Sequence, residues 1–270
     1  MLACLQMCSV DSVESNLAVV RRLVAQAAMN GATLILLPEN FAFIGSDSGQ
    51  FCSIAESHLD GPIQAAIQAL AIQWKLWIVA GTIPIQEKGS DKLHAASMIF
   101  DADGQLVARY DKIHLFDVQV SDSESHNESD TFVAGQDVEV VDTPLGKVGL
   151  SVCYDLRFAE MYRTLARKGA EIFVVPAAFT ATTGQAHWEI LLRARAIENL
   201  CYVAAANQTG THPGGRSTWG HSMMIDPWGK ILQQVGKGEN IILSAIDKSQ
   251  QSALRRQFPC HEHHILERTL

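Results

Sequence analysis

The segment VGLSVCYDLRF, residues 148–158, joins an apolar run to a charged one. Val148, Leu150 and Val152 alternate with other residues, and this period of two is typical of a β-strand. A helical pattern follows, so Cys153 stands where the strand ends. A cysteine in that place is either a small buried filler or a nucleophile presented at the end of a strand.

Strand and helix patterns alternate on both sides of this segment, as expected of an α/β fold. Residues 12–30 place apolar side chains three and four apart, on one face of a helix that Gly31 terminates. Asp60 is placed to cap a second helix, with Pro62 in its first turn. Further helices are expected near 158–168 and at 186–200, and buried strands at 33–40, 76–82, 171–179 and 201–208.

Two segments of similar pattern predict β-hairpins. The first is ASMIFDADGQLVARYDKIHL (96–115), with its turn at 101–104, and the second is HSMMIDPWGKILQQV (221–235). A unit of strand, helix, strand and hairpin thus occurs twice, so we expect residues 1–270 to form a single domain of two similar halves. Between the halves, the acidic stretch 117–136 is long for a connection, and is either disordered or functional.

The composition narrows the classes of partner. The chain of 270 residues is long enough to bury a core, and its formal net charge of −8 argues against nucleic acid or an anionic membrane as the main partner. No apolar run approaches the roughly 18 residues of a membrane span, and the segment MLACLQMCSVDS lacks the features of a signal peptide. We therefore expect a cytoplasmic protein.

The six cysteines include no CxxC pair, so free thiols are expected. The cysteine and histidines near the C-terminus are crowded, and no matching pair of ligands stands out elsewhere. We therefore expect no metal there, and no other cofactor. A redox role for Cys153 would require a resolving cysteine, and none lies near it in the sequence. The crowded group is Cys260, His261, His263 and His264.

Three polar residues follow apolar, strand-like runs: Glu39 in ILLPENF, Lys112 in RYDKIHLFD, and Cys153. Active sites of α/β sheets gather outside the carboxyl ends of strands, so these side chains are expected to converge. Burial behind Leu37 and Pro38 would raise the pKa of Glu39 and suit it to general base catalysis. Taken singly, each residue also has an ordinary explanation, as a paired carboxylate, an exposed lysine or a buried thiol.

Together the three motifs LLPENF, YDKIHLFD and GLSVCYDLRF resemble the Glu-Lys-Cys signatures of the nitrilase, or carbon–nitrogen hydrolase, superfamily. The resemblance extends to the tail RRQFPCHEHH and so covers nearly the whole chain. Within the superfamily, DKIHLFD and CYDLRFAEMYR are most similar to the branch of the deaminated glutathione amidases, with the ω-amidases close by.

This resemblance implies a four-layer α-β-β-α sandwich that forms a homodimer or a higher homo-oligomer. It also implies a second glutamate between the Lys and Cys motifs, for which Glu128 fits best and Glu124 is the alternative. In the implied mechanism Cys153 attacks an amide carbonyl and Glu39 transfers the proton. Lys112 and the backbone N–H of Tyr154 would stabilise the oxyanion.

The implied substrate is a small amide that carries carboxylates, for which Arg157 is a candidate ligand or else a structural residue of the following helix. Phe179, Thr180 and Asn207 follow two further strands and are expected at the pocket. Deaminated glutathione is the leading substrate. An ω-amidase acting on α-ketoglutaramate or succinamate, and a catalytically silent interaction protein of the same fold, are the alternatives.

Overall fold

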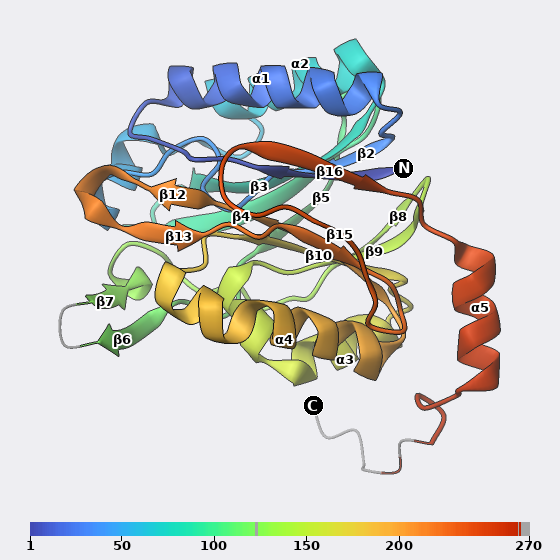
Figure 1. Cartoon of the computed structure of the whole chain (residues 1–270). Coiled ribbons are helices and arrows are strands. Elements are labelled where there is room, and N and C mark those ends of the chain that lie inside the picture. Colours follow the sequence, from blue (N-terminus) through green and yellow to red (C-terminus); the bar gives the residue numbers. More distant parts are fainter. Residues whose placement is uncertain (122–123, 264, 266–270) are drawn as a thin grey trace.

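The computed structural model describes residues 1–121, 124–263 and 265. It forms four layers, in which two β-sheets pack face to face and helices cover both outer faces (Figure 1). Helices α1 (Val13–Met29) and α2 (Pro62–Trp74) cover one sheet, and α3 (Ala159–Arg167) and α4 (Ala181–Asn199) cover the other. The four-layer α-β-β-α sandwich expected from the sequence is confirmed.

The two sheets have matching strand orders. The first is β16-β1-β2-β3-β4-β5 and the second is β8-β9-β10-β11-β14-β15, and the parallel and antiparallel pairings occur in the same sequence in both. The strands of the first sheet are β1 (Leu2–Gln6), β2 (Leu34–Leu36), β3 (Trp77–Gln86), β4 (Leu93–Phe100), β5 (Leu106–Asp111) and β16 (Asn240–Ser244). Those of the second are β8 (Val140–Thr143), β9 (Gly146–Leu150), β10 (Ile172–Ala177), β11 (Tyr202–Asn207), β14 (Met223–Ile225) and β15 (Ile231–Gln234).

Alternation along the buried strands explains the layering. Leu2 and Cys4 of β1 face the second sheet, whereas Ala3 and Leu5 face the helices α1 and α2. Because successive side chains of a strand point to opposite faces, an entirely apolar strand fills both contacts at once. This is why the central strands are continuous apolar runs, as the sequence indicated.

Several predicted boundaries differ from the observed ones. The strand expected at 33–40 pairs only over Leu34–Leu36, since the chain turns away at the segment that carries Glu39. The prediction that Asp60 caps α2 is wrong: Gly61 occupies the N-cap without a side-chain hydrogen bond, and Pro62 begins the helix. Helix α4 begins at Ala181, earlier than expected, because the side chain of Thr180 caps it.

The stretch 117–136 contains β6 (Asp117–Ser121), β7 (Glu124–Asn127) and a single 3-10 turn, η2 (Glu128–Asp130). The two strands pair antiparallel and form a hairpin at one end of the sandwich (Figure 1). A second small sheet joins β12 (Thr209–Thr211) to β13 (Ser217–Trp219). The 3-10 segments η1 (Ser48–Ile54), η3 (Cys153–Arg157) and η4 (Pro213–Gly215) lie in loops.

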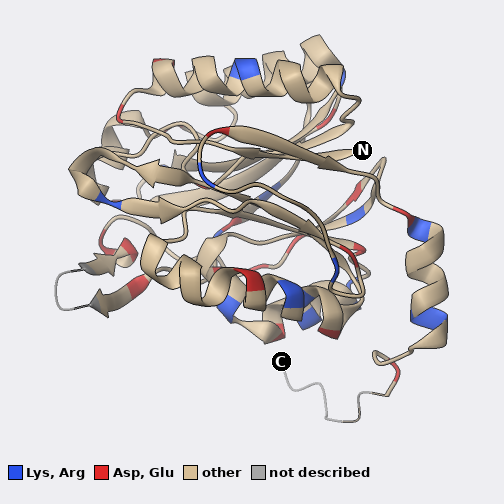
Figure 2. Cartoon of the chain, viewed as in Figure 1, with Lys and Arg blue, Asp and Glu red and all other residues tan. Residues whose placement is uncertain are grey.

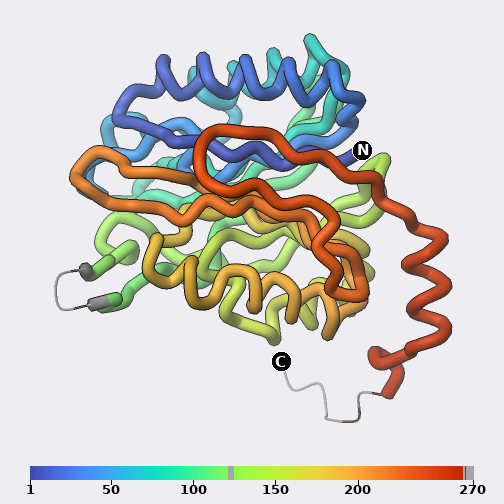
Figure 3. The backbone as a smooth tube through the Cα atoms, in the orientation of Figure 1, coloured from blue at the N-terminus to red at the C-terminus, as the bar shows by residue number. Residues whose placement is uncertain are grey.

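Helix α5 (Lys248–Gln257) leaves the sandwich and runs beside its edge (Figure 3). Gln251 and Arg255 fasten it by donating hydrogen bonds to main-chain carbonyls, including that of Leu200. In the tail, the ring of His261 bonds to the carbonyl of Asn199 at 2.7 Å, and His264 lies outside the described residues. Figure 2 shows basic and acidic residues interspersed on α3 and α4. Within the described ranges, no helix has the length and apolarity that crossing a membrane requires.

Candidate active site

A cavity of about 640 Å³ lies where strands of both sheets end. Glu39, Lys112, Glu128 and Cys153 all line it, although they come from four separate segments of the chain. The first two belong to the first half, Glu128 to the β6–β7 region and Cys153 to the second half. The convergence of strand-end side chains expected from the sequence is therefore present as geometry.

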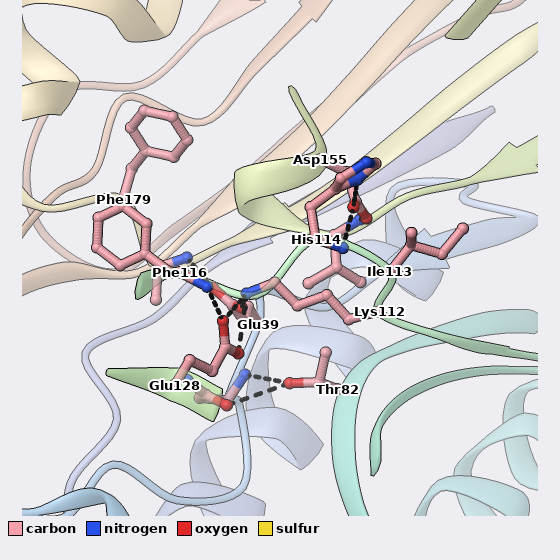
Figure 4. A network of polar contacts seen from close by, with 12 residues as sticks. Glu39, Thr82, Lys112, Ile113, His114, Phe116, Glu128, Asp155 and Phe179 are labelled. Carbon is pink, nitrogen blue, oxygen red and sulfur yellow. Dashed lines mark hydrogen bonds and ion pairs between the residues drawn. The ribbon is translucent and has the colours of Figure 1, made fainter. Parts of the chain in front are cut away.

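Lys112 lies between two carboxylates (Figure 4). Its Nζ donates to Glu39 Oε1 at 2.8 Å, and to Glu128 Oε1 and Oε2 at 2.9 and 2.8 Å. The Lys112 and Glu39 side chains are only 2% and 5% exposed. Because a buried ammonium is costly unless paired, the two carboxylates are what make this lysine possible inside the protein.

Local backbone geometry presents each member of this cluster. Pro38 and Glu39 pass close to β3 at Gly81, where a Cβ atom would lie 1.9 Å from the carbonyl oxygen of Pro38. Only glycine fits there. Lys112 follows β5, and its backbone N–H donates to Ala95. The position of Glu128 is set by the backbone N–H of Phe116, which donates to its Oε2 at 2.7 Å.

Cys153 begins η3 with a φ of 47°, in the left-handed region that non-glycine residues adopt rarely. Its side chain lies close enough to Glu39 and to the backbone N–H of Ala178 for both groups to shift the pKa of the thiol. That same N–H donates to Glu39 Oε2 at 2.8 Å. The thiol is buried, with 7% exposure. A strained turn thus holds the sulfur against a carboxylate, as nucleophilic catalysis requires.

Asp155 holds that turn in place. Its fully buried carboxylate accepts hydrogen bonds from the backbone of Val152 at 2.8 Å and from the hydroxyl of Tyr110 at 2.7 Å. The other oxygen accepts from the backbone of His114 at 3.1 Å and contacts its ring nitrogen at 2.7 Å. Asp155 therefore links the turn that carries Cys153 to the loop that follows Lys112 (Figure 4).

The electrostatics differ from the expectation at Glu39. Burial alone would raise the pKa of Glu39, but the charge and hydrogen bond of Lys112 outweigh it, and the pKa lies below its usual value. The pKa of Glu128 is raised, because burial and the negative charge of Glu39 together outweigh the lowering effect of the positive charge of Lys112. The expectation of a raised pKa at Glu39 is therefore wrong, since the cation is closer than the sequence could show.

Burial and the neighbouring Glu39 charge raise the pKa of the Cys153 thiol well above its usual value. Burial alone would lower the pKa of Lys112, but the carboxylates of Glu128 and Glu39 raise it well above the ordinary value. The resting cluster therefore holds a neutral thiol beside an ionised carboxylate. Such a thiol becomes a nucleophile only when the carboxylate takes its proton.

The residues predicted to bind substrate divide into two groups. Tyr154, Phe179 and Thr180 line the cavity. Arg157 and Asn207 are not part of the cavity lining. Asn207 Oδ1 accepts a hydrogen bond from the backbone N–H of Phe179 at 3.0 Å, so Asn207 supports the loop that carries Phe179. The guanidinium of Arg157 lies 5.8 Å from the ring of Tyr154 and 5.4 Å from that of Phe179, and it is not among the residues that line the cavity.

Sequence reasoning did not single out two residues that the structure brings to the site. One is Asp155, and the feature of the sequence that could have indicated it is its position two residues after Cys153. The other is Arg216, which lines the cavity and donates from Nη2 to the carbonyl of Ala178 at 2.7 Å. Its signal was a lone cation directly after the glycine pair at 214–215.

Residues 1–256 match the family model described as carbon-nitrogen hydrolase. The chain belongs to this family, whose members are hydrolases of carbon–nitrogen bonds. A protein of Yersinia enterocolitica named deaminated glutathione amidase is 43% identical to it, over 97% of this chain and 92% of that protein. A human protein of the same name is 39% identical, over 97% and 81% of the two chains.

A solved structure supports the same assignment. The crystal structure of Saccharomyces cerevisiae Nit3, described as a member of branch 10 of the nitrilase superfamily, superposes with a TM-score of 0.85. It is 31% identical to this chain and covers 96% of it and 93% of the yeast chain. The membership and the fold expected from the three motifs are therefore both confirmed.

Proposed function

We propose that this protein is a thiol amidase that hydrolyses deaminated glutathione to 2-oxoglutarate and cysteinylglycine. The observation that carries the proposal is the buried cluster in which Lys112 binds both Glu39 and Glu128, and in which the Glu39 carboxylate neighbours the Cys153 thiol. The relatives named for this activity, at 39–43% identity, support the choice of substrate.

In the proposed reaction, Glu39 takes the Cys153 proton as the sulfur attacks the amide carbonyl. Lys112 and the backbone N–H of Tyr154 stabilise the oxyanion, and a donor of this kind is typically worth about 3 kcal/mol of barrier. Glu39 then protonates the departing amine as the C–N bond breaks, which leaves a thioester. A water activated by Glu39 hydrolyses it, releases the carboxylate and restores the thiol.

Glu128 acts in this proposal as a positioning residue. It binds Lys112 through both carboxylate oxygens and is itself held by the backbone of Phe116. With Glu128 in place, Lys112 stays charged and directed at the reacting atoms while Glu39 changes its protonation state. The contacts to Lys112 support Glu128, and the side chain of the alternative, Glu124, lies outside the described part of the structure.

The remaining expectations belong to the same proposal. Because the cluster combines residues of both halves, residues 1–270 act as one catalytic domain. The role is metabolite repair in the cytoplasm, without a metal or other cofactor. Homodimerisation would cover the apolar outer face of α4, where Ile190 and Ile197 are 70% and 48% exposed and Trp228 lies nearby at 64%.

The test compares kcat/KM of the purified protein for deaminated glutathione and for α-ketoglutaramate. We expect a preference for deaminated glutathione. A preference for the small amide would replace the proposal with the ω-amidase alternative. Alkylation by iodoacetamide tests the alternative of a catalytically silent protein. That alternative would be favoured if the protein showed no measurable turnover and Cys153 reacted no faster than the buried Cys201.

A further inference from the structure

The cavity has two lysine or arginine side chains in its described lining, and they differ in charge balance. Lys112 is surrounded by Glu39 and Glu128, so its charge is already neutralised. Arg216 forms no ion pair with any carboxylate of the described chain, and its one hydrogen-bond acceptor is the neutral carbonyl of Ala178. Arg216 therefore acts on Glu39 only through the field of its charge, and its hydrogen-bond donors are not taken up by any carboxylate of the described chain.

Several donors of Arg216 remain unused by the protein. Nη2 donates to Ala178, while Nε is buried and has no acceptor among the described residues. Nη1 likewise makes no hydrogen bond to the described part of the chain. A guanidinium carries five N–H donors in a fork that matches a carboxylate, and a half-buried fork with unused donors favours an anionic ligand.

The loop that carries Arg216 is held rigidly. The ring of His212 is buried between the carbonyl of Ser9, at 2.8 Å, and the hydroxyl of Thr218, at 2.7 Å. The backbone of His212 donates to the carbonyl of Arg216 at 2.8 Å, and the turn between them closes through Gly214 and Gly215, which have φ values of 76° and 86°. The guanidinium is thus presented from a preorganised turn, which lowers the entropic cost of binding.

Arg216 also lies close to the reacting atoms. The carbonyl of Ala178 accepts a hydrogen bond from the Arg216 guanidinium, and the N–H of Ala178 donates to Glu39 Oε2. One residue therefore separates the guanidinium from the general base, so a carboxylate a few bonds from the scissile amide can reach it. On a protein of net charge −8, with Glu39 and Glu128 in the cavity, such a group offsets the repulsion of an anionic substrate.

We propose that Arg216 binds a carboxylate of the substrate and so restricts the enzyme to anionic amides. The inference rests on the proposed function, whose substrate has two carboxylates. One belongs to the keto-acid on the acyl side, and the other ends the leaving cysteinylglycine. Both offer the same chemistry to the guanidinium, and the experiment below separates them.

The experiment measures kcat/KM of the wild type and of Arg216→Gln for four amides. These are deaminated glutathione, its C-terminal carboxamide, α-ketoglutaramate, and 4-oxopentanamide, in which a methyl group replaces the acyl carboxylate. We expect Arg216→Gln to lower kcat/KM roughly 10- to 100-fold for amides that keep the bound carboxylate, as for a lost charged hydrogen bond. The effect on amides that lack it should be less than about threefold.

The pattern of losses identifies the carboxylate. If Arg216 binds the acyl side, Arg216→Gln impairs all three keto-acid amides and spares 4-oxopentanamide. If it binds the leaving side, only deaminated glutathione is impaired. Equal losses for all four amides would overturn the proposal, because Arg216 would then act on the reaction rather than on the anion. Arg216→Lys, which keeps the charge without the fork, should fall between the wild type and Arg216→Gln for the charged amides alone.

A second measurement does not depend on turnover. Glutarate and 2-oxoglutarate should slow the alkylation of Cys153 by iodoacetamide in the wild type, and much less in Arg216→Gln. Arg21→Gln, which removes an exposed arginine of α1, is the matched control and should be protected like the wild type.

A wild-type protein that hydrolyses neither keto-amide, yet shows protection that depends on Arg216, would refute the proposed function alone. Protection that Arg216→Gln or a folded Arg216→Lys leaves unchanged would refute the role of Arg216. If Arg216→Gln does not fold, the kinetics of Arg216→Lys are used instead. Equal losses of kcat/KM in Arg216→Lys for charged and neutral amides would then refute the role of Arg216.

Discussion

The two halves of the molecule share one topology and differ in chemistry. Leu36 of β2 pairs with Cys4 of β1, and Val174 of β10 pairs with Leu150 of β9, so these strands correspond. Beyond them, LLPENF (36–41) corresponds to VVPAAF (174–179). Glu39 thus has Ala177 as its counterpart, and Cys153 has Met7.

The hairpins correspond as well. Lys112 and Lys237 stand at the same offset from the turn residues Asp101 and Asp226, but Lys237 is exposed and has no carboxylate at the counterpart of Glu39. The topology therefore provides two equivalent sets of strand ends, and one set of side chains from both halves builds a single site. Which strand end becomes catalytic depends on its residue, not on its place in the fold.

The largest expected effect comes from replacing the sulfur. Cys153→Ala should lower kcat/KM by roughly 10⁴-fold or more, since removing the nucleophile leaves only binding and oxyanion stabilisation. The control is Cys8→Ala, next to Met7 in the corresponding segment of the other half, which should retain near-normal turnover. The unfolding transition of Cys153→Ala should match that of the wild type. A Cys153→Ala variant that still turns over substrate would show that the halves do not differ as we infer.

The next effect separates the two influences of Glu39 on the thiol. Glu39→Gln should lower kcat about 10²- to 10⁴-fold, because the proton acceptor is lost. The Glu39 charge is, after burial, the main cause of the raised pKa of Cys153, so its removal should lower that pKa. Alkylation of Cys153 should then begin at a lower pH in Glu39→Gln than in the wild type, although turnover falls.

The pH profile of alkylation, measured by mass spectrometry at Cys153, checks this prediction. Cys201 serves as an internal reference, because burial raises its pKa to about 12 and its surroundings do not include Glu39. A profile that moves to higher pH in Glu39→Gln would mean that Glu39 activates the thiol already in the resting state, against the electrostatics of the cluster.

The comparison also explains what the sequence could predict. Strand ends and hairpin turns are local features, and the motifs around Glu39, Lys112 and Cys153 were therefore placed correctly. The direction of the Glu39 pKa shift was predicted wrongly, since it depends on Lys112, which lies 73 positions away in the chain. Residues next to a motif were equally ambiguous. Arg157 is close to Cys153 in sequence but packs against two aromatic rings and does not line the cavity, whereas distant Arg216 does.

A smaller effect is expected at the close approach between β3 and the Glu39 segment. Gly81 corresponds to Ala206 of β11, as the register of Trp77 with Leu34 and of Tyr202 with Ile172 shows. Gly81→Ala would bring a Cβ against the Pro38 carbonyl, and should cost about 1–3 kcal/mol of stability.

Chemical unfolding with urea measures this cost, and Ala206→Gly is the matched variant. We expect about 0.5–1 kcal/mol from Ala206→Gly, the ordinary penalty for glycine within a strand. Because Gly81→Ala also displaces Glu39, it should reduce kcat, whereas Ala206→Gly should leave kcat closer to normal. Equal costs and equal activities would show that the close approach is not specific to the half that carries the carboxylate.

The smallest effect tests where the halves should be indistinguishable. Asp101 Oδ1 accepts the backbone N–H groups of Asp103 and Gln105, and Asp226 Oδ1 accepts those of Trp228 and Lys230, all at 2.9 Å. Asp101→Ala and Asp226→Ala should each cost about 1 kcal/mol, and the double variant about the sum, because the turns share no partners. Urea unfolding of the three variants measures this, and kcat should be unchanged for Asp226→Ala. Unequal single costs, or a double variant far from additivity, would mean that the hairpins support the two halves differently despite identical hydrogen bonds, and that the asymmetry of the molecule extends beyond the residues at its strand ends.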